Sequence, residues 1–511
     1  MPCRKTTLAI LLLGLAGAAQ AELLLVYSVQ RHGARNVLNK TATLKETDAN
    51  GGPTLLPQGQ RQAYDAGLSF RDRYLNSSAC ANGLSCLDAS LVDSEPEYGV
   101  VGSADGIFNN FNTLIRSSSL DRAIMTARSF LDAVFPPINQ PTDTTYLPDR
   151  QQVVPVYSQA ADGDAIIRGY TACPAYDNRL LEWYASPEFQ EKEMESQAFR
   201  DAVATQAATI DVKLNTSLTE WWNVFDGFNV YRTYNLGNEM PPVDNETFAE
   251  MQELAYWLET SKMRSNLTGN LLGGALLADL LEFLDKAVTV ISANVLPNIY
   301  YKLVHLSGHY NTQLGVLGAL EIDQDPAAAD VTWFSKIPSL AALMAFELHG
   351  DASGDQSPQD LAVRLVMQDG PEADYVTIPL PCASPGDSAE VLAGAGSCSF
   401  DSFRALAAPK ALNTLDDWCD ACENDSWTAC QLLAATRALN TSTDAAGTES
   451  GSSDDSGTGL SSGAVAGIAV GCALAGAVLA VLATTMYGRR ARAKMAHDQL
   501  MSVHGSLPST V

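Results

Sequence analysis

Basic residues are scarce in this chain of 511 residues. Lys and Arg together number 32 against 59 Asp and Glu, which gives a formal net charge of −27. A surface this acidic repels a phosphate backbone over most of its extent, so nucleic acid is excluded as a partner. With 46% hydrophobic and 18% charged residues, the chain is too apolar for a disordered protein and long enough to bury a sizeable core.

Charge is absent from two apolar runs near the ends of the chain. At the N-terminus, two cations precede the apolar residues 8–18 and the small residues at 19–21, a pattern typical of a signal peptide cleaved before Glu22. Residues 463–487 are uncharged and long enough to cross a hydrocarbon core of about 30 Å, and the four cations that follow indicate its cytoplasmic side. The sequence therefore predicts a single-pass type I membrane protein with a signal peptide (1–21), an exported domain (22–439), a Ser/Gly/Thr-rich stalk (440–462), a transmembrane helix (463–487) and a cytoplasmic tail (488–511).

Small residues recur at every fourth position of the predicted membrane helix, at Gly463, Gly467, Gly471 and Ala475. Such a face lets two helices approach closely, which is compatible with a homodimer. Small residues are also common in any alanine-rich span, so the pattern alone leaves both interpretations open. The tail carries no clear tyrosine sorting signal. Plasma membrane and endosome or lysosome membrane are therefore both open as the location, with the large domain extracellular or lumenal.

Eight cysteines lie outside the signal peptide and the membrane helix. In an oxidising compartment an even set predicts disulfides, although sequence alone leaves the pairing open. Acceptor sites for N-glycosylation agree with passage through a secretory pathway. These sites are Asn39, Asn76, Asn215, Asn245, Asn266, Asn424 and Asn440.

The exported part opens on a continuous apolar run, residues 23–29, of the kind that forms a strand buried on both faces. The motif Arg31-His32-Gly33-Ala34-Arg35 follows directly. Two flanking cations depress the pKa of a histidine and keep a ring nitrogen free, which favours a nucleophile at His32. Gly33 would let the backbone turn sharply and let an anion approach. Taken alone, the motif is also compatible with a surface loop of salt-bridged arginines.

Two further segments bring candidate residues to the ends of strands. Arg116 follows an apolar pair and precedes a capping-box pattern from Ser118 to Asp121, so we expect a helix to begin there and to offer an anion site at its N-terminus. A strand-like run over residues 300–307 leads to His309. Because the carboxyl ends of parallel strands share one edge of a sheet, one site could collect all three segments.

These segments resemble the histidine acid phosphatases of the lysosomal and prostatic type. The resemblance extends over nearly the whole exported part. Its further motifs are Leu56-Pro57-Gln58-Gly59, Phe70-Arg71-Asp72-Arg73-Tyr74, Ile115 to Arg122, Val154-Pro155-Val156-Tyr157, Cys173-Pro174, Leu272-Gly273-Gly274 and Met344-Ala345-Phe346-Glu347-Leu348. It implies an α/β fold with a mostly parallel sheet flanked by helices and a helical cap over about residues 173–290. No metal or organic cofactor is implied.

The resemblance also implies a function and the roles of individual residues. It makes His32 the nucleophile of a phosphomonoester hydrolase, with the phosphate held by Arg31, Arg35, Arg116 and His309. A membrane-anchored acid phosphatase acting through a phosphohistidine intermediate is thus expected, with inositol phosphates, phosphopeptides and sugar phosphates all open as substrates.

The chain departs from this family directly after the second histidine. Tyr310 stands where the family has a carboxylate that protonates the leaving alcohol. A phenol, with a reference pKa near 10, is a poor proton donor at acidic pH. The alternative function is therefore a catalytically weak or inactive phosphatase-like domain that binds phosphorylated ligands or mediates surface interaction.

The cysteine pairs are predicted on different grounds. Cys80 with Cys86 follows from their proximity in the sequence. Cys382 with Cys398 and Cys173 with Cys422 are implied by the resemblance, and Cys419 with Cys430 is left by elimination.

Overall fold

The computed structural model describes residues 21–40, 52–76, 87, 108–137, 147, 149, 151–161, 163–234, 240–293, 300–324, 335–351 and 357–446. Residues 1–20, the pair Cys80 and Cys86, and residues 447–511 lie outside this part. Within the described ranges, no helix is both long and apolar enough to cross a bilayer. The predicted membrane helix and its small-residue face lie outside them. Residues up to Arg437 belong to one compact unit, and a second unit begins at Ala438.

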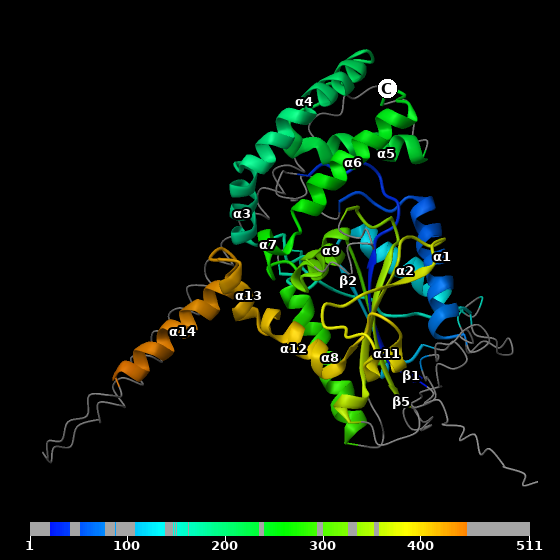
Figure 1. The fold of residues 1–511 in the computed structure, drawn as a ribbon, viewed down its shortest axis with the longest axis vertical. Coiled ribbons are helices and arrows are strands. Elements are labelled where there is room, and N and C mark those ends of the chain that lie inside the picture. Colours follow the sequence, from blue (N-terminus) through cyan, green and yellow to red (C-terminus); the bar gives the residue numbers. More distant parts are fainter. Residues whose placement is uncertain are drawn as a thin grey trace, which may run out of the picture. The chain divides into compact units, whose positions relative to one another are not determined.

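A mixed β-sheet forms the centre of the larger unit (Figure 1). The strand order is β3-β2-β4-β1-β5-β6-β7, and β8 pairs with β6. The strands are β1 (Ala21–Arg31), β2 (Thr113–Ser118), β3 (Tyr157–Gln159), β4 (Leu303–Gly308), β5 (Leu343–Asp351), β6 (Ala362–Gln368), β7 (Tyr375–Ile378) and β8 (Cys398–Ser399).

The prediction of a mostly parallel sheet is wrong for half of the sheet. β3, β2, β4 and β1 are parallel, but every pairing among β1, β5, β6, β7 and β8 is antiparallel. Only six residues separate β6 from β7, among them Asp369 and Gly370. So short a connection cannot make the crossover that parallel strands require, and it forms a hairpin instead.

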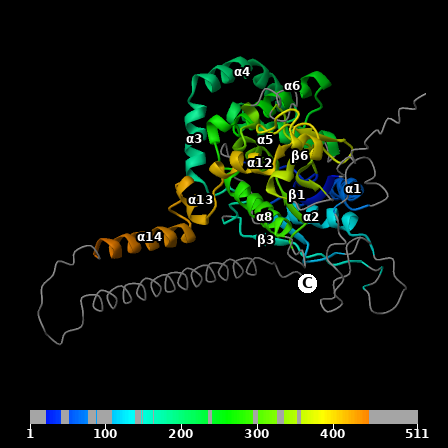
Figure 2. The same cartoon turned by 60° about the horizontal axis from the view of Figure 1, so that its bottom comes forward.

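Helices cover both faces of the sheet, because its central strands are apolar on both sides. On one face, Val26 packs with Phe70 of α1 (Pro57–Tyr74) and Phe130 of α2 (Asp121–Val134). On the other face, Tyr27 and its neighbours pack against α8 (Gly274–Ser292), α9 (Tyr310–Ala319) and α12 (Phe400–Ala407). Figures 1 and 2 both show α1 and α2 on the opposite side of β1 from α8.

His305 of β4 lies inside this core. Its ring stacks on Phe130 at a centroid distance of 4.2 Å, and Nδ1 shares a hydrogen bond of 2.9 Å with Ser28 Oγ. Burial lowers the pKa of His305 to about 3. This histidine therefore remains neutral in the folded protein and serves packing.

Among the described residues, six α-helices run between β3 and β4, through the interval where the sequence predicts a cap. They are α3 (Pro174–Tyr184), α4 (Pro187–Ala208), α5 (Trp221–Tyr234), α6 (Asn245–Ser261), α7 (Ser265–Thr268) and α8. Of these, α8 belongs to the layer on the sheet. The aromatic side chains of α5 join the same hydrophobic core as the sheet, so these helices are not a separately packed domain.

The C-terminal part begins with α11 (Ser388–Ala393), α12 and α13 (Leu415–Ala421) and ends in α14 (Thr428–Ala446). The flexible stalk predicted from residue 440 is wrong for its first residues, because α14 continues through 440–446. The Ala-rich turns before residue 440 are good helix formers, and extending an existing helix is easier than starting one.

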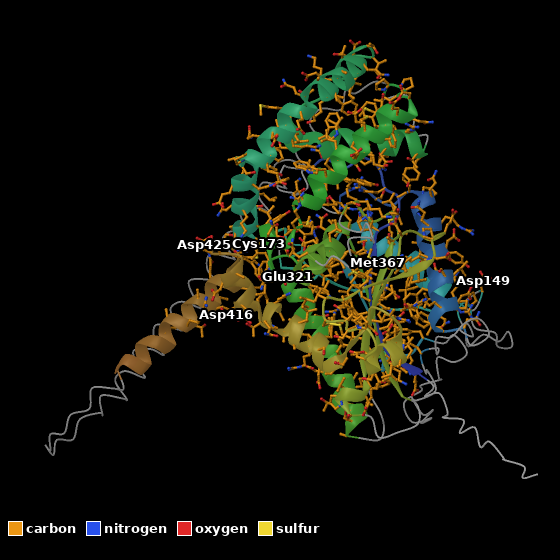
Figure 3. All side chains as sticks on the ribbon, viewed as in Figure 1. Asp149, Cys173, Glu321, Met367, Asp416 and Asp425 are labelled. Atoms are coloured by element: carbon orange, nitrogen blue, oxygen red, sulfur yellow. A yellow bond between two sulfur atoms is a disulfide. The ribbon has the colours of Figure 1, made fainter. Side chains whose placement is uncertain are left out.

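Three predicted disulfides are present in the structure: Cys173 with Cys422, Cys382 with Cys398, and Cys419 with Cys430. The first joins the start of α3, where Figure 3 labels Cys173, to the residue that follows α13. The fourth predicted pair lies outside the described residues.

The predicted glycosylation sites differ in exposure. Asn39, Asn215, Asn245 and Asn266 are exposed, and Asn76 is half-buried; the side chain of Asn440 is not described. Asn424 is the exception, because it is only 6% exposed and its Nδ2 donates to the Ala172 carbonyl at 2.6 Å. Since a glycan would be attached at this nitrogen, the folded arrangement disfavours glycosylation at Asn424, which stays a prediction from the sequence.

Candidate active site

The carboxyl ends of three parallel strands meet at one edge of the sheet. Arg31 ends β1 opposite Gly308 of β4, and Ser117 of β2 lies opposite Ser307. The chain then leaves each strand into a loop or helix. The convergence expected from the sequence is therefore present, and it brings the Arg31 to Arg35 motif next to His309.

His32 is held as a neutral imidazole with one nitrogen free. Its Nδ1 lies 2.8 Å from the Gly33 carbonyl oxygen, which can only accept, so Nδ1 carries the hydrogen and Nε2 keeps its lone pair. Burial lowers the pKa of His32 well below 6.5, and the charges of Arg122, Arg35 and Arg31 lower it further. A neutral histidine with a fixed tautomer is prepared to act as a nucleophile.

Gly33 serves close packing. A Cβ on Gly33 would lie 2.3 Å from the Gly59 carbonyl oxygen, and a Cβ on Gly59 would lie 2.2 Å from the Ala34 carbonyl oxygen. The Gly33 N–H donates to Thr126 Oγ1 at 3.0 Å. Two glycines thus let the histidine loop lie against the start of α1. Gly33 is not among the glycines with positive φ in the described residues, so close packing is what requires a glycine there.

His309 faces His32 across the site. The two rings meet edge to face with centroids 5.4 Å apart, and Ser118 Oγ shares a hydrogen bond of 3.0 Å with His309 Nε2. Burial lowers the pKa of His309 well below 6.5, and so do the charges of Arg122, Arg168, Arg31 and Arg35. Both histidines are thus neutral in a strongly positive field, which attracts an anion.

The two arginines of the motif are anchored in different ways. Arg31 donates to the Pro338 carbonyl, and burial together with the neighbouring charge of Arg35 lowers its pKa. Arg35 forms a bidentate ion pair with Asp226 of α5, at 2.9 and 3.0 Å. Since α5 follows β3 in the chain, a helix far away in sequence fixes the direction of this guanidinium.

Arg116 belongs to a different group of charges. The prediction that Arg116 binds the phosphate is therefore wrong. Its guanidinium binds both carboxylate oxygens of Asp279 on α8, and Tyr27 donates to the same carboxylate at 2.6 Å. The expected helix start is also displaced. Ser118 is still in β2, α2 begins at Asp121, and Arg116 therefore lies within a strand, where a helix dipole does not act on it.

Arg122 takes the position in the site that the sequence assigned to Arg116. It is 1% exposed, in the first turn of α2, and its charge acts on the pKa of both His32 and His309. A signal for it existed. A buried cation in the first turn of a helix is disfavoured by the positive end of the dipole, and its presence there indicates an anion site.

Tyr310 follows His309 as expected, but its hydroxyl is committed elsewhere. It donates to the carboxylate of Glu259 on α6 and accepts a hydrogen bond of 2.6 Å from Lys40 Nζ. Burial and the charge of Glu259 raise the pKa of Tyr310 well above 10. Tyr310 is therefore unsuited to donate a proton.

A cavity of about 750 Å³ opens beside Arg31. Aromatic rings form part of its wall, among them Trp222 and Tyr256 from α5 and α6. Its charged lining residues are Arg31, Arg61, Asp65, Asp369 and Glu372. Among the described residues, no group of three or more His, Cys, Asp or Glu side chains could hold a metal ion.

A family model described as histidine phosphatase superfamily (branch 2) matches residues 38–368, more than half of the chain. The chain belongs to this superfamily. The matched residues include Arg122, His309 and Tyr310 but begin after His32. The role of His32 in this histidine phosphatase is therefore argued from its geometry.

Curated relatives of this histidine phosphatase include two human acid phosphatases. Lysosomal acid phosphatase of Homo sapiens is 22% identical over 388 residues, covering 74% of this chain and 82% of that protein. Prostatic acid phosphatase of Homo sapiens is 25% identical over 316 residues, covering 59% and 70%. Among solved structures, the apo phytase of Hafnia alvei is 13% identical with a TM-score of 0.49, covering 79% of this chain and 98% of that chain.

Proposed function

We propose that this histidine phosphatase is an acid phosphatase that hydrolyses phosphomonoesters through a phosphohistidine intermediate on His32. The observation that carries the proposal is the neutral His32, whose Nδ1 hydrogen is bound by Gly33 and whose Nε2 lies among positive charges. The similarity to the human lysosomal and prostatic acid phosphatases supports the same reaction.

The reaction has two displacements at phosphorus. The Nε2 lone pair of His32 attacks the phosphate, the bond to the leaving oxygen breaks, and water then attacks the phosphohistidine to release phosphate. Negative charge on the transferred group is greatest at its equatorial oxygens. We assign the stabilisation of these oxygens to Arg31, Arg35, Arg122 and His309, because fixed cations and donors cost no reorganisation during the reaction.

The cavity favours singly phosphorylated substrates among the classes left open by the sequence. Its three acidic lining residues outnumber the one arginine outside the phosphate site, Arg61, which is itself bound to Asp65 at 2.8 Å. Additional phosphate groups would therefore meet carboxylates. Inositol phosphates with many phosphates are disfavoured relative to phosphopeptides or small monoesters.

Hydrolysis of para-nitrophenyl phosphate at pH 5 by the purified chain tests the proposal. We expect steady release of para-nitrophenol. Binding of inorganic phosphate without any turnover would instead support the alternative function, a phosphatase-like domain that recognises phosphorylated ligands.

The location is proposed on separate grounds. The lysosomal and prostatic acid phosphatases among the relatives support a lysosomal or secreted protein. Anchoring through residues 463–487 and dimerisation through their small residues stay predictions from the sequence.

Separate substitution of Arg116 and Arg122 tests which of the two arginines binds the phosphate. We assign this role to Arg122 from the structure, whereas the sequence alone predicts it for Arg116. Arg122→Gln should lower kcat/KM for para-nitrophenyl phosphate by about 10²–10³-fold, because a fixed charge on the transition state is lost. Arg116→Gln should lower the free energy of unfolding rather than kcat/KM, since Asp279 loses its half-buried partner. Steady-state kinetics and thermal melts of both variants check this, and the reverse pattern would restore Arg116 to the site.

A further inference from the structure

A buried group of four side chains adjoins the site and has no part in the mechanism above. Lys40, Glu259, Lys262 and Tyr310 form this group, the Lys40 cluster. Lys40 Nζ donates to Tyr310 Oη at 2.6 Å and to Glu259 Oε2 at 3.2 Å, while Lys262 Nζ donates to Glu259 Oε1 at 2.7 Å. Since Tyr310 directly follows His309, the cluster begins one residue from the phosphate site.

Two members of the Lys40 cluster have the wrong protonation behaviour for an acid catalyst. Tyr310 donates its proton to Glu259, and its raised pKa holds that proton. Burial raises the pKa of Glu259, but Lys262 and Lys40 outweigh burial and lower it to about 2. Glu259 is therefore a carboxylate at any working pH and has no proton to give.

Lys40 lies next to the wall of the cavity, although its own buried side chain is not one of the lining residues. Its Nζ is 4.1 Å from the ring centroid of Trp222 and 5.1 Å from that of Tyr310, and the Arg31 guanidinium is 5.2 Å from the same Tyr310 ring. Trp222 and Arg31 both line the cavity. A substrate with its phosphate at Arg31 and its alcohol in the cavity therefore lies in the space that Trp222 lines, and Lys40 Nζ lies against the ring of that tryptophan.

We infer that Lys40 protonates the leaving oxygen, in the place of the carboxylate that the family carries after the second histidine; this rests on the proposed function. When His32 Nε2 bonds to phosphorus, the P–O electron pair stays on the leaving oxygen, which takes a proton from Lys40 Nζ. Neutral Lys40 then accepts a proton from the water that attacks the phosphohistidine. The P–N electron pair returns to His32, and the ammonium is restored.

The charges around Lys40 suit this exchange. Glu259 faces Lys40 from α6, and Lys262 faces it from the C-terminal end of the same helix. Asp226 contributes its charge from α5, and Tyr310 contacts Lys40 from α9. Arg31 lies near the ring of Tyr310. Burial and Lys262 lower the pKa of Lys40, Glu259 and Asp226 raise it, and the result is about 7. Lys40 is thus charged at acidic pH, and alkyl ester turnover should fall as the pH rises through about 7.

Comparison of alkyl and aryl esters tests the inference, because an aryl leaving group barely needs a proton. In the full chain, Lys40→Met should lower kcat/KM for glycerol phosphate by about 10²–10⁴-fold and that for para-nitrophenyl phosphate far less. Lys40→Arg should show the same selective loss, since a guanidinium keeps the charge but does not release a proton. The decline of wild-type alkyl turnover near pH 7 needs no variant and remains a test if Lys40→Met does not fold.

Three matched variants complete the design. Lys262→Met, which removes the other lysine bound to Glu259, should lower both rates together, and Tyr310→Phe should lower alkyl turnover less than Lys40→Met does. Asp164, whose pKa burial raises to about 6, is the rival proton donor. Asp164→Asn should not lower alkyl ester turnover more than aryl ester turnover.

Three outcomes would overturn the inference. They are an equal loss on both esters in Lys40→Met, retained alkyl turnover in Lys40→Arg, and a selective loss of alkyl turnover in Asp164→Asn. Failure of the wild type to hydrolyse either ester would instead overturn the proposed function and this inference with it.

Discussion

Replacement of His32 by Ala is expected to lower kcat for every phosphomonoester by about 10⁴-fold or more, the scale of loss when a covalent mechanism loses its nucleophile. No neighbouring group can substitute. The other imidazole in the site, His309, is held by Ser118, and its ring lies edge-on to His32. Steady-state turnover of para-nitrophenyl phosphate measures the loss.

Trapping of the phosphohistidine intermediate tests the role of His32 by a second measurement. Wild-type protein mixed with a ³²P-labelled substrate and quenched in alkali should carry phosphohistidine, and His32→Ala should carry none. Inorganic phosphate should still bind the variant, because Arg31, Arg35 and Arg122 remain. Label retained by His32→Ala would show that another residue is the nucleophile.

Local patterns were sufficient for the parallel half of the sheet and for part of the site. The apolar run before His32 forms β1, the run before His309 forms β4, and both end at the same edge. These predictions succeed because a buried parallel strand is continuously apolar and its C-terminal end leads directly to the functional loop.

The errors in the site have one physical cause, which is that pairing between distant segments is not encoded locally. Arg116 and Arg122 lie six residues apart, and the sequence alone does not show that Asp279, far along the chain, neutralises the first of them. In the same way, Lys40 meets Tyr310 only because the helices after β3 place Glu259 between two lysines. The hairpin between β6 and β7 differs, since Asp369-Gly370 was a readable turn signal that the prediction of a mostly parallel sheet overlooked.

Replacement of Glu347 by Gln is expected to lower the free energy of unfolding by about 3–5 kcal/mol, the usual cost of removing one partner from a buried ion network. Glu347 lies fully buried on β5 between two guanidiniums. Arg73 Nη2 donates to it at 2.9 Å and Arg364 Nε at 2.7 Å, and Tyr74 Oη donates at 2.6 Å. A neutral amide would leave two cations with too few acceptors. Urea denaturation at pH 7 measures the loss, and Glu191→Gln, at an exposed position of α4, is the matched control with an expected change below about 0.5 kcal/mol.

The pH dependence of stability separates the charge of Glu347 from its packing. Burial would raise the pKa of Glu347, but its hydrogen bond with His349 and the charges of Arg364 and Arg73 lower it well below 4.5. In the unfolded chain this carboxyl takes up a proton near pH 4.5, so its contribution is present above that pH and is lost as the pH falls further. Wild-type stability should therefore decline more steeply below pH 4.5 than that of Glu347→Gln, and the two curves should converge in acid. Parallel curves would show that the loss at pH 7 comes from packing and not from the buried charge.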